Sequence, residues 1–200
     1  GQSRRMGGGD KFLKKINDVT ILNMVIDRFS PQVPSLIISA NGDVERLSAY
    51  GLPVVKDPIE NYAGPLAGIL SAMIWAETHQ PEKTHILSVA ADTPLFPLNY
   101  SEKMLESASA LPNDTIILAK SQGRHHPIFG LWPVSLKDDL ATNLDNGLRK
   151  IRAWTDACNN ASIEFDHIEI NDQITDPFFN INEPSDFQIF ENLVSNHLVD

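Results

Sequence analysis

The sequence predicts one α/β domain built on a mostly parallel sheet with helices on both faces. Short apolar runs with strand character alternate with apolar residues at helical spacing through the first half of the chain. That alternation is typical of βαβ units. The 200 residues are enough for one domain with a sizeable core. We see no internal repeat or long linker, and we therefore expect residues 1–200 to form a single domain.

Local patterns predict the individual elements in chain order. Apolar residues recur at helical spacing over 20–29, 100–111, 136–144 and 148–154, which predicts four helices. Gly64-Pro65 should open another helix, because proline suits the first helical turn, and Pro184 precedes a C-terminal one. Apolar runs predict buried strands over 35–40, 52–55, 85–91, 115–119 and 128–132, and alternating residues predict a strand over 163–170.

Composition excludes several classes of protein. With 42% hydrophobic and 21% charged residues, the chain is not wholly disordered. A formal net charge of −10 argues against broad nucleic-acid binding. The single cysteine, Cys158, excludes a disulfide framework and a Cys-rich metal site. No apolar run is long enough to cross a membrane and no signal peptide is visible, so we expect a cytoplasmic protein.

The first eleven residues, Gly1 to Lys11, combine glycines with basic side chains. Glycine lets consecutive backbone N–H groups converge on an anion, and the adjacent cations favour phosphate. The segment therefore predicts a polyphosphate cradle, and the alternative is a solvated tail. It is not a P-loop, because Phe12 follows Lys11. Since a strand normally precedes such a loop, we expect a strand of about 5–6 residues ahead of Gly1.

Three polar residues come directly after predicted strands: Asn41, Asp57 and Asp92. In open parallel sheets, ligands bind beyond the carboxyl ends of the strands. Mg²⁺ is held by one or two carboxylates together with substrate phosphates, so Asp92 is the best candidate metal ligand. The alternative for Asp92 is a turn or capping residue before Thr93-Pro94.

The second half of the chain offers weaker signals. Residues 124–127, Arg-His-His-Pro, lack a third ligand at metal-site spacing and predict a solvated or substrate-contacting loop. Asn182 suits the N-cap of the last helix, whereas Asn180 has no such explanation. No Ser-His-Asp or Cys-His arrangement is apparent. A phosphate acceptor, whose second pKa is about 6, would need no general base.

Gly1 to Lys11 resembles the signature loop of small-molecule nucleotidyltransferases, although the Leu-x-Gly that usually leads it is absent. Further segments resemble the molybdenum cofactor guanylyltransferases and occur in that family's order. They are Ser39-Ala40-Asn41, Gly64-Pro65-Leu66-Ala67-Gly68, Asp92-Thr93-Pro94, His126-Pro127 and Phe179-Asn180-Ile181-Asn182 with Pro184.

The resemblance implies a Rossmann-like three-layer nucleotidyltransferase fold and transfer of GMP from GTP to the phosphate of molybdenum-bound molybdopterin. It implies that Gly1, Arg5 and Lys11 hold the triphosphate, that Ser39 and Asp57 contact the nucleoside, and that Asp92 binds Mg²⁺ near the α-phosphate. Arg5, Lys11 and Asp92 would be the catalytic residues. The molybdopterin would be contacted by Arg124, His126, Pro127, Asn180 and Asn182.

Two alternatives remain open at this stage. One is a cytidylyl- or uridylyltransferase that acts on another phosphorylated small molecule. Ser39 bears on this choice, because the family often has an amide side chain there. The other is a non-catalytic nucleotide-binding module of the same fold. The resemblance also implies handover of the product to other cofactor-biosynthesis or acceptor proteins. The net charge and the short apolar runs lead us to expect no nucleic-acid or membrane partner.

Overall fold

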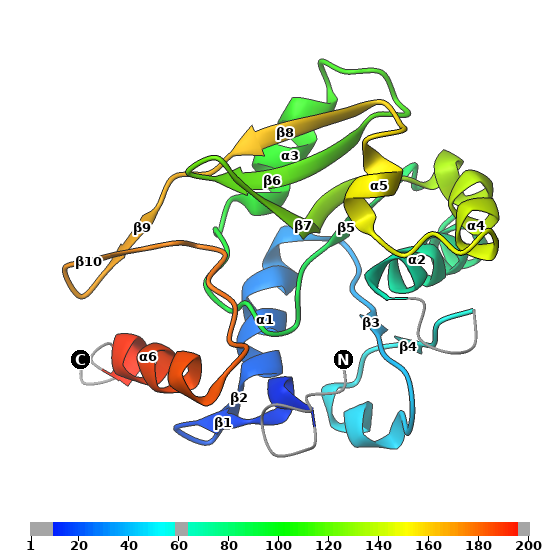
Figure 1. Ribbon diagram of the computed structural model, residues 1–200. Coiled ribbons are helices and arrows are strands. Elements are labelled where there is room, and N and C mark those ends of the chain that lie inside the picture. The colour runs from blue at the N-terminus through cyan, green and yellow to red at the C-terminus, as the bar shows by residue number, and fades with distance from the viewer. Residues whose placement is uncertain (1–9, 59–63, 196–200) are drawn as a thin grey trace.

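The computed structural model describes residues 10–58 and 64–195 and confirms the α/β fold class, with helices packed on both faces of the central sheet (Figure 1). The helices are α1 (Ile21–Phe29), α2 (Pro65–His79), α3 (Tyr100–Ala108), α4 (Lys137–Asp145), α5 (Ile151–Thr155) and α6 (Pro184–Ser195). Short 3₁₀ turns are η2 (Lys11–Leu13), η3 (Ser30–Gln32), η4 (Glu45–Tyr50) and η5 (Val134–Leu136).

The strands form one larger sheet and three small ones within this part of the chain. The larger sheet has the order β5 (His85–Ser88), β7 (Arg124–Pro133), β6 (Ile116–Ser121), β8 (Asn160–Glu164). β3 (Ile38–Ser39) pairs with β4 (Val54–Val55) in parallel. Two hairpins complete the set: β1 (Lys15–Ile16) with β2 (Val19–Thr20), and β9 (Ile168–Ile170) with β10 (Gln173–Thr175).

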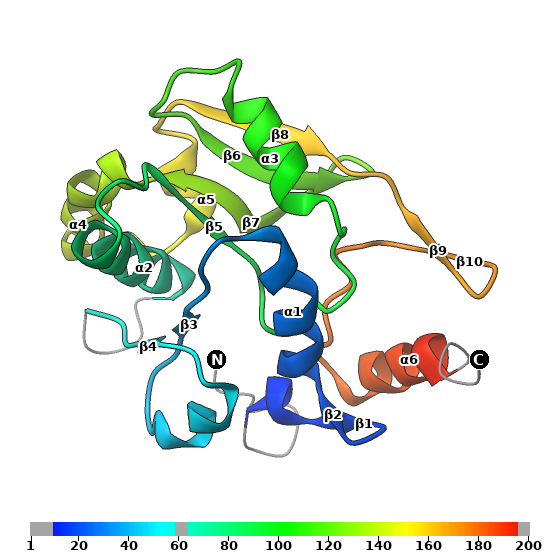
Figure 2. The ribbon, with the colours of Figure 1, turned by 180° about the vertical axis from the view of Figure 1, so that it is seen from behind.

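Successive residues of β6 face opposite layers of the core. Ile116 and Leu118 pack with residues of α2, α4 and α5 on one face. Ile117 and Ala119 pack with residues of α1 and α3 on the other. This alternation is the period of a strand buried on both sides, and it produces three layers. Figure 2, the view from behind, shows α3 lying across β6 and β8.

The sheet is more mixed than the sequence predicts. β6 and β8 pair in parallel, but β7 runs antiparallel to both β5 and β6. The reason is the connection between β6 and β7, a two-residue turn at Gln122 and Gly123 with φ of 44° and 78°. Positive φ at both central residues is typical of a tight hairpin, whose strands must be antiparallel.

Two local predictions are wrong. Residues 124–127 belong to β7 rather than to a loop, because the hairpin turn has already ended at Gly123. Pro127, which has no N–H to donate, lies where the register between β6 and β7 shifts. The expected strand over 163–170 is divided into β8 and β9, and β9 leaves the sheet to pair with β10 across Asn171 and Asp172.

A groove of about 870 Å³ separates β3 from β5. Residues of α1 and α2 line it along with those of the two strands, and most of these are apolar, including Val25, Phe29 and Ile69. The amides of Ile38 and Ala40 donate to the β4 side. Because successive groups of a strand point to opposite sides, the intervening amides of β3 face the groove.

Candidate functional site

The polar end of the groove gathers residues from the ends of β3, β4 and β5. Its lining includes six polar residues that the sequence singles out: Lys11, Ser39, Asn41, Asp57, Asp92 and Asn180. Ser39, Asp57 and Asp92 lie at or just beyond the ends of these three strands, whereas Lys11 belongs to η2 and Asn180 precedes α6. This is the location at which open α/β sheets bind ligands.

Lys11 contacts both Asp92 and Asn182 at this end of the groove. Its ammonium forms an ion pair with the carboxylate of Asp92 and donates to Asn182 Oδ1 at 2.6 Å. Asp92 lies just beyond β5, and its backbone oxygen accepts from Ile181 N at 3.0 Å, which brings the segment before α6 beside it. The side chain of Asn182 therefore accepts a hydrogen bond from Lys11 and does not cap α6. The carboxylate of Asp186 caps this helix instead, because its Oδ2 accepts from Glu183 N at 2.8 Å.

A second group of contacts fixes the ends of β3 and β4. Asn41 Nδ2 donates to Asp57 Oδ2 at 2.6 Å, and Asp57 N donates to Asn41 Oδ1 at 2.9 Å, so the two residues hold each other in place. Arg46 Nη2 donates to Asn41 O at 2.9 Å. Gly68 of α2 approaches closely, since a Cβ built on it would lie 2.7 Å from Ser39 Oγ. Ser39 and Asp57 are thus packed side by side against α2.

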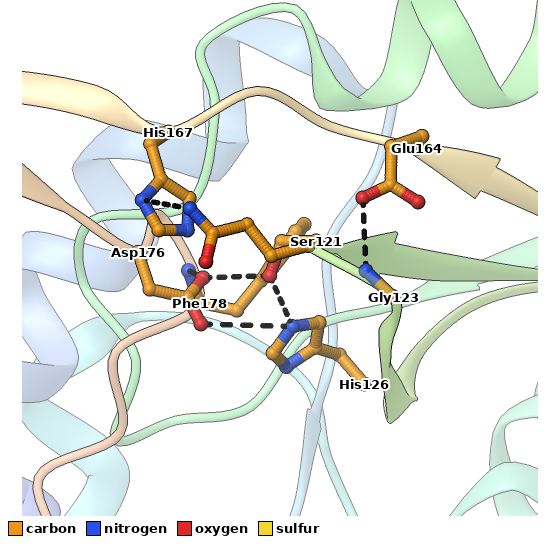
Figure 3. Close-up of polar contacts among 8 residues, drawn as sticks. Ser121, Gly123, His126, Glu164, His167, Asp176 and Phe178 are labelled. Carbon is orange, nitrogen blue, oxygen red and sulfur yellow. Dashed lines mark hydrogen bonds and ion pairs between the residues drawn. The ribbon is translucent and has the colours of Figure 1, made fainter.

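A separate polar cluster, formed by Ser121, His126 and Asp176, lies at the far end of β6 (Figure 3). Ser121 Oγ is 2.7 Å from His126 Nε2 and donates to Asp176 Oδ1 at 2.9 Å. The same Oδ1 accepts from Phe178 N at 2.9 Å, and the Phe178 ring lies 4.4 Å from the His126 ring. Burial lowers the pKa of His126, although the Asp176 charge opposes this.

No Ser-His-Asp arrangement is apparent in the sequence, yet the fold brings Ser121, His126 and Asp176 into contact. The three residues are brought together by the β6–β7 hairpin and by a segment 55 positions away, a separation that no sequence motif reveals. Their geometry is not that of a nucleophilic triad, in which histidine takes the serine proton. Here the hydroxyl donates to the carboxylate, and Ser121 is only 1% exposed.

The residues predicted to face the acceptor substrate are divided between the two clusters. Asn180 lines the groove, and its Oδ1 is buried without a hydrogen-bond partner in the described part of the chain. Asn182 contacts Lys11. His126 belongs to the far cluster, Arg124 is exposed, and Pro127 follows His126 along β7. Residues 176–182 connect the clusters. Gly1 and Arg5 lie outside the described residues.

Metal-binding potential at the groove rests on Asp92. Over residues 10–58 and 64–195, no three His, Cys, Asp or Glu side chains are placed to hold an ion together. A single carboxylate at the end of a strand nevertheless fits Mg²⁺, which takes most of its ligands from phosphate and water. Burial raises the pKa of the Cys158 thiol, which makes it a poor nucleophile. Among the described helices, none has the length and apolar character needed to span a membrane.

Comparison with known families identifies the chain. Residues 1–160 match the family described as the MobA-like NTP transferase domain. The chain belongs to the MobA-like NTP transferase family. A molybdenum cofactor guanylyltransferase of Mesorhizobium japonicum is 42% identical over 187 residues, which cover 93% of this chain and 88% of that protein.

Solved structures agree in fold. The molybdopterin-guanine dinucleotide biosynthesis protein A of Archaeoglobus fulgidus superposes with a TM-score of 0.75 at 20% identity and covers 98% of this chain and 95% of its own. A CMP:2-keto-3-deoxy-manno-octonic acid synthetase superposes with a TM-score of 0.71 at 12% identity, with the same coverage of the two chains. These likenesses confirm the nucleotidyltransferase fold that the sequence motifs imply.

Proposed function

We propose that this protein transfers GMP from GTP to the terminal phosphate of molybdenum-bound molybdopterin and releases pyrophosphate. An oxygen of the acceptor phosphate forms a bond to the α-phosphorus of GTP, and the bond from that phosphorus to the bridging oxygen of the β-phosphate breaks. The curated relatives named for this activity, about 40% identical over most of the chain, support the choice of reaction.

The ion pair between Lys11 and Asp92 is the observation that carries the proposal. A lysine ammonium has three donors. In the described part of the chain two of them are directed at Asp92 and Asn182, and the third is available to a phosphate oxygen in the groove. Lys11 would bind the triphosphate, and Asp92 and Asn182 would orient its ammonium. Gly1 and Arg5 would extend the cradle on the N-terminal side.

The nucleoside would lie against Ser39 and Asp57, which are held by Asn41 and α2 at the same end of the groove. Asn180 Oδ1, buried and unpartnered within the described residues, supports a contact with the acceptor substrate. Arg124, His126 and Pro127 would contact the acceptor from β7. No general base is required, because a phosphate monoester is largely ionised at neutral pH with a second pKa of about 6.

A divalent metal, which we propose to be Mg²⁺, would be held by Asp92 together with the phosphates of GTP. When bound, it supplies positive charge that offsets the negative charge developing on the phosphate oxygens. Lys11 supplies a further positive charge beside the same carboxylate. This arrangement relies on positioning and electrostatics rather than on proton transfer.

The deciding experiment measures pyrophosphate release with Mg²⁺ and each of GTP, CTP, UTP and ATP, with and without molybdopterin. Release that needs both GTP and molybdopterin is expected. Release with CTP or UTP and another phosphorylated acceptor would make the protein a different nucleotidyltransferase. Nucleotide binding without release under any of these conditions would favour a non-catalytic binding module.

Two pairs of variants test the assigned residues. Asp92→Asn should lower turnover by roughly 10²-fold or more while GTP binding changes much less, because the lost charge acts mainly in the transition state. Asp172→Asn is the matched control, since Asp172 is an exposed residue of the β9–β10 turn with φ of 59°, which asparagine also adopts. Lys11→Ala should weaken GTP binding, and Lys14→Ala, which removes a lysine over the Phe187 ring, should not.

We also propose a single domain whose first strand precedes Gly1 and lies between β3 and β5, in a cytoplasmic protein. The apolar groove with β3 amides facing it supports the strand, and the free Cys158 fits a reducing compartment. If an apolar strand-forming segment is added ahead of Gly1, the extended chain should melt at a higher temperature. It should also protect the Ile37 and Ser39 amides from hydrogen exchange. Unchanged exchange at both amides would contradict the proposal.

A further inference from the structure

The hydrogen bonds of Ser121 assign the proton on His126. A serine hydroxyl has one proton, and a carboxylate can only accept. Since Ser121 Oγ donates to Asp176 Oδ1 at 2.9 Å, it must accept from His126 Nε2, which lies 2.7 Å away. The other carboxylate oxygen, Asp176 Oδ2, lies 3.9 Å from the same Nε2 and favours a proton there. The proton of a neutral His126 therefore sits on Nε2.

This leaves Nδ1 of His126 as a hydrogen-bond acceptor. The two ring nitrogens point in different directions, and Figure 3 shows Nε2 directed at Ser121 and Asp176. Nδ1 has no hydrogen-bond partner within residues 10–58 and 64–195. The Phe178 ring, 4.4 Å from the imidazole centroid, restrains the ring plane. His126 is 8% exposed, so it is desolvated but still reaches the surface.

We propose that Ser121 and Asp176 are positioning residues that hold His126 as the Nε2–H tautomer, so that Nδ1 accepts a hydrogen bond from a ring or amino N–H of the heterocyclic acceptor substrate. This inference rests on the proposed function for the identity of that substrate. A pterin carries such N–H donors at its edge. In the opposite tautomer, the Nδ1–H of His126 would face the N–H of the substrate, and the two donors would repel each other.

The tautomer can be measured without any activity. In protein labelled with ¹⁵N-histidine, long-range ¹H–¹⁵N correlation spectra distinguish protonated from unprotonated ring nitrogens. We expect His126 to show protonated Nε2 and unprotonated Nδ1 at neutral pH. Observation of a proton on Nδ1 in the unmodified protein would overturn the proposal, whatever reaction the protein catalyses.

The pKa of His126 adds a second spectroscopic readout. The charged groups acting on it are Asp176 and Glu164, which raise its pKa, and Arg124 and His125, which lower it, in addition to burial. Asp176→Asn keeps an acceptor oxygen for Ser121 and for Phe178 N but removes the negative charge. It should lower the pKa of His126 further, and an unchanged or raised pKa would contradict the assigned contact.

Kinetics then test the role in recognition. Ser121→Ala should raise KM for molybdopterin by about 2- to 13-fold, the effect of losing one hydrogen bond, and leave the Kd for GTP unchanged. Ser162→Ala is the matched control, because Ser162 Oγ lies 3.3 Å from Nδ1 of the neighbouring His125. Equal effects of both variants, or an equal loss of GTP affinity in Ser121→Ala, would overturn the positioning role. Failure of the unmodified protein to use molybdopterin would instead reject the proposed function and leave the tautomer result standing.

Discussion

Replacing Gly68 by alanine should weaken nucleotide binding without harming the fold. The added Cβ would lie 2.7 Å from Ser39 Oγ, whereas ordinary contacts begin near 3.4 Å, so the hydroxyl would have to retreat by about 0.7 Å. The same Cβ would lie 3.8 Å from Asp57 Oδ1, which is an acceptable contact. The substitution therefore acts on Ser39 and spares Asp57.

The size of each effect follows from this geometry. Alanine is favoured over glycine inside a helix by about 0.5–1 kcal/mol, and Gly68 lies within α2. Ser39 is exposed, so its hydroxyl can swing to another rotamer at a cost of a similar size. The free energy of unfolding should thus change by less than about 1 kcal/mol. Loss of the hydrogen bond proposed between Ser39 and the nucleoside should raise the Kd for GTP by about 2- to 13-fold.

A double-mutant cycle separates this mechanism from a general disturbance of α2. In the Ser39→Ala background, the Cβ at position 68 would lie 3.6 Å from the Cβ of residue 39 and 3.8 Å from Asp57 Oδ1, and both are ordinary contacts. Gly68→Ala should then have no further effect on GTP affinity, measured by calorimetry, with chemical denaturation run on all four proteins. An equal loss of affinity in both backgrounds would refute the reasoning, and so would unaltered affinity when Ser39 is present.

Two further predictions concern stability. Gly130→Ala should cost about 1–3 kcal/mol by denaturant titration, because its Cβ would lie 2.5 Å from the fully buried ring of Trp132, and a variant as stable as the parent would show that the strand can shift. Acidification should also destabilise the protein. Burial lowers the pKa of three histidines in the folded state: His85, His125 and His126. The unfolded chain therefore binds more protons below about pH 6.5, and the free energy of unfolding should fall as the pH drops through that value. Urea unfolding midpoints at pH 7.5 and 5.5 measure this effect. A higher midpoint at pH 5.5 would contradict the expected direction.

Helices and buried strands could be predicted because their signals are local. The apolar spacing of 20–29 and the Gly64-Pro65 start correspond to α1 and α2 within one or two residues. Thr20 is the N-cap of α1, and its side-chain oxygen accepts a hydrogen bond from Asn23 N at 3.1 Å. The strand-end position of Asp92 follows equally from the apolar run before it. Such features depend on a few consecutive residues, and one sequence displays them.

Two of the hairpins escape prediction because their turns lack the glycine that usually follows Asn or Asp in a two-residue hairpin turn. Positive φ at Asn17 and Asp18 closes β1 and β2 without the glycine that normally announces such a turn. The same holds for Asn171 and Asp172 between β9 and β10. At the third hairpin, the Pro127 that follows two histidines indicates a loop by composition, yet the strand continues past it through a change of register.

The polar contacts of the candidate site lie beyond sequence reasoning for a different reason. Lys11 and Asn182 are 171 residues apart, and Ser121 and Asp176 are 55 apart. The sequence shows which residue types are chemically capable, but only the fold decides which of them meet. Asn182 illustrates the point, since its local context favours a helix cap, while the folded chain directs its side chain to Lys11.

Residues 176–182 contact both the polar contacts around Lys11 and Asp92 and the cluster that contains Ser121 and His126. At one end, Asp176 Oδ1 accepts from Ser121 Oγ and Phe178 N, each at 2.9 Å. At the other, Ile181 N donates to the backbone of Asp92 at 3.0 Å. A segment held at both ends has little freedom to move one cluster relative to the other. In-line transfer between two phosphates needs both substrates fixed within a fraction of an ångström. If the donor binds at Lys11 and the acceptor at His126, as proposed above, this short, doubly anchored segment would be a physical means of aligning them.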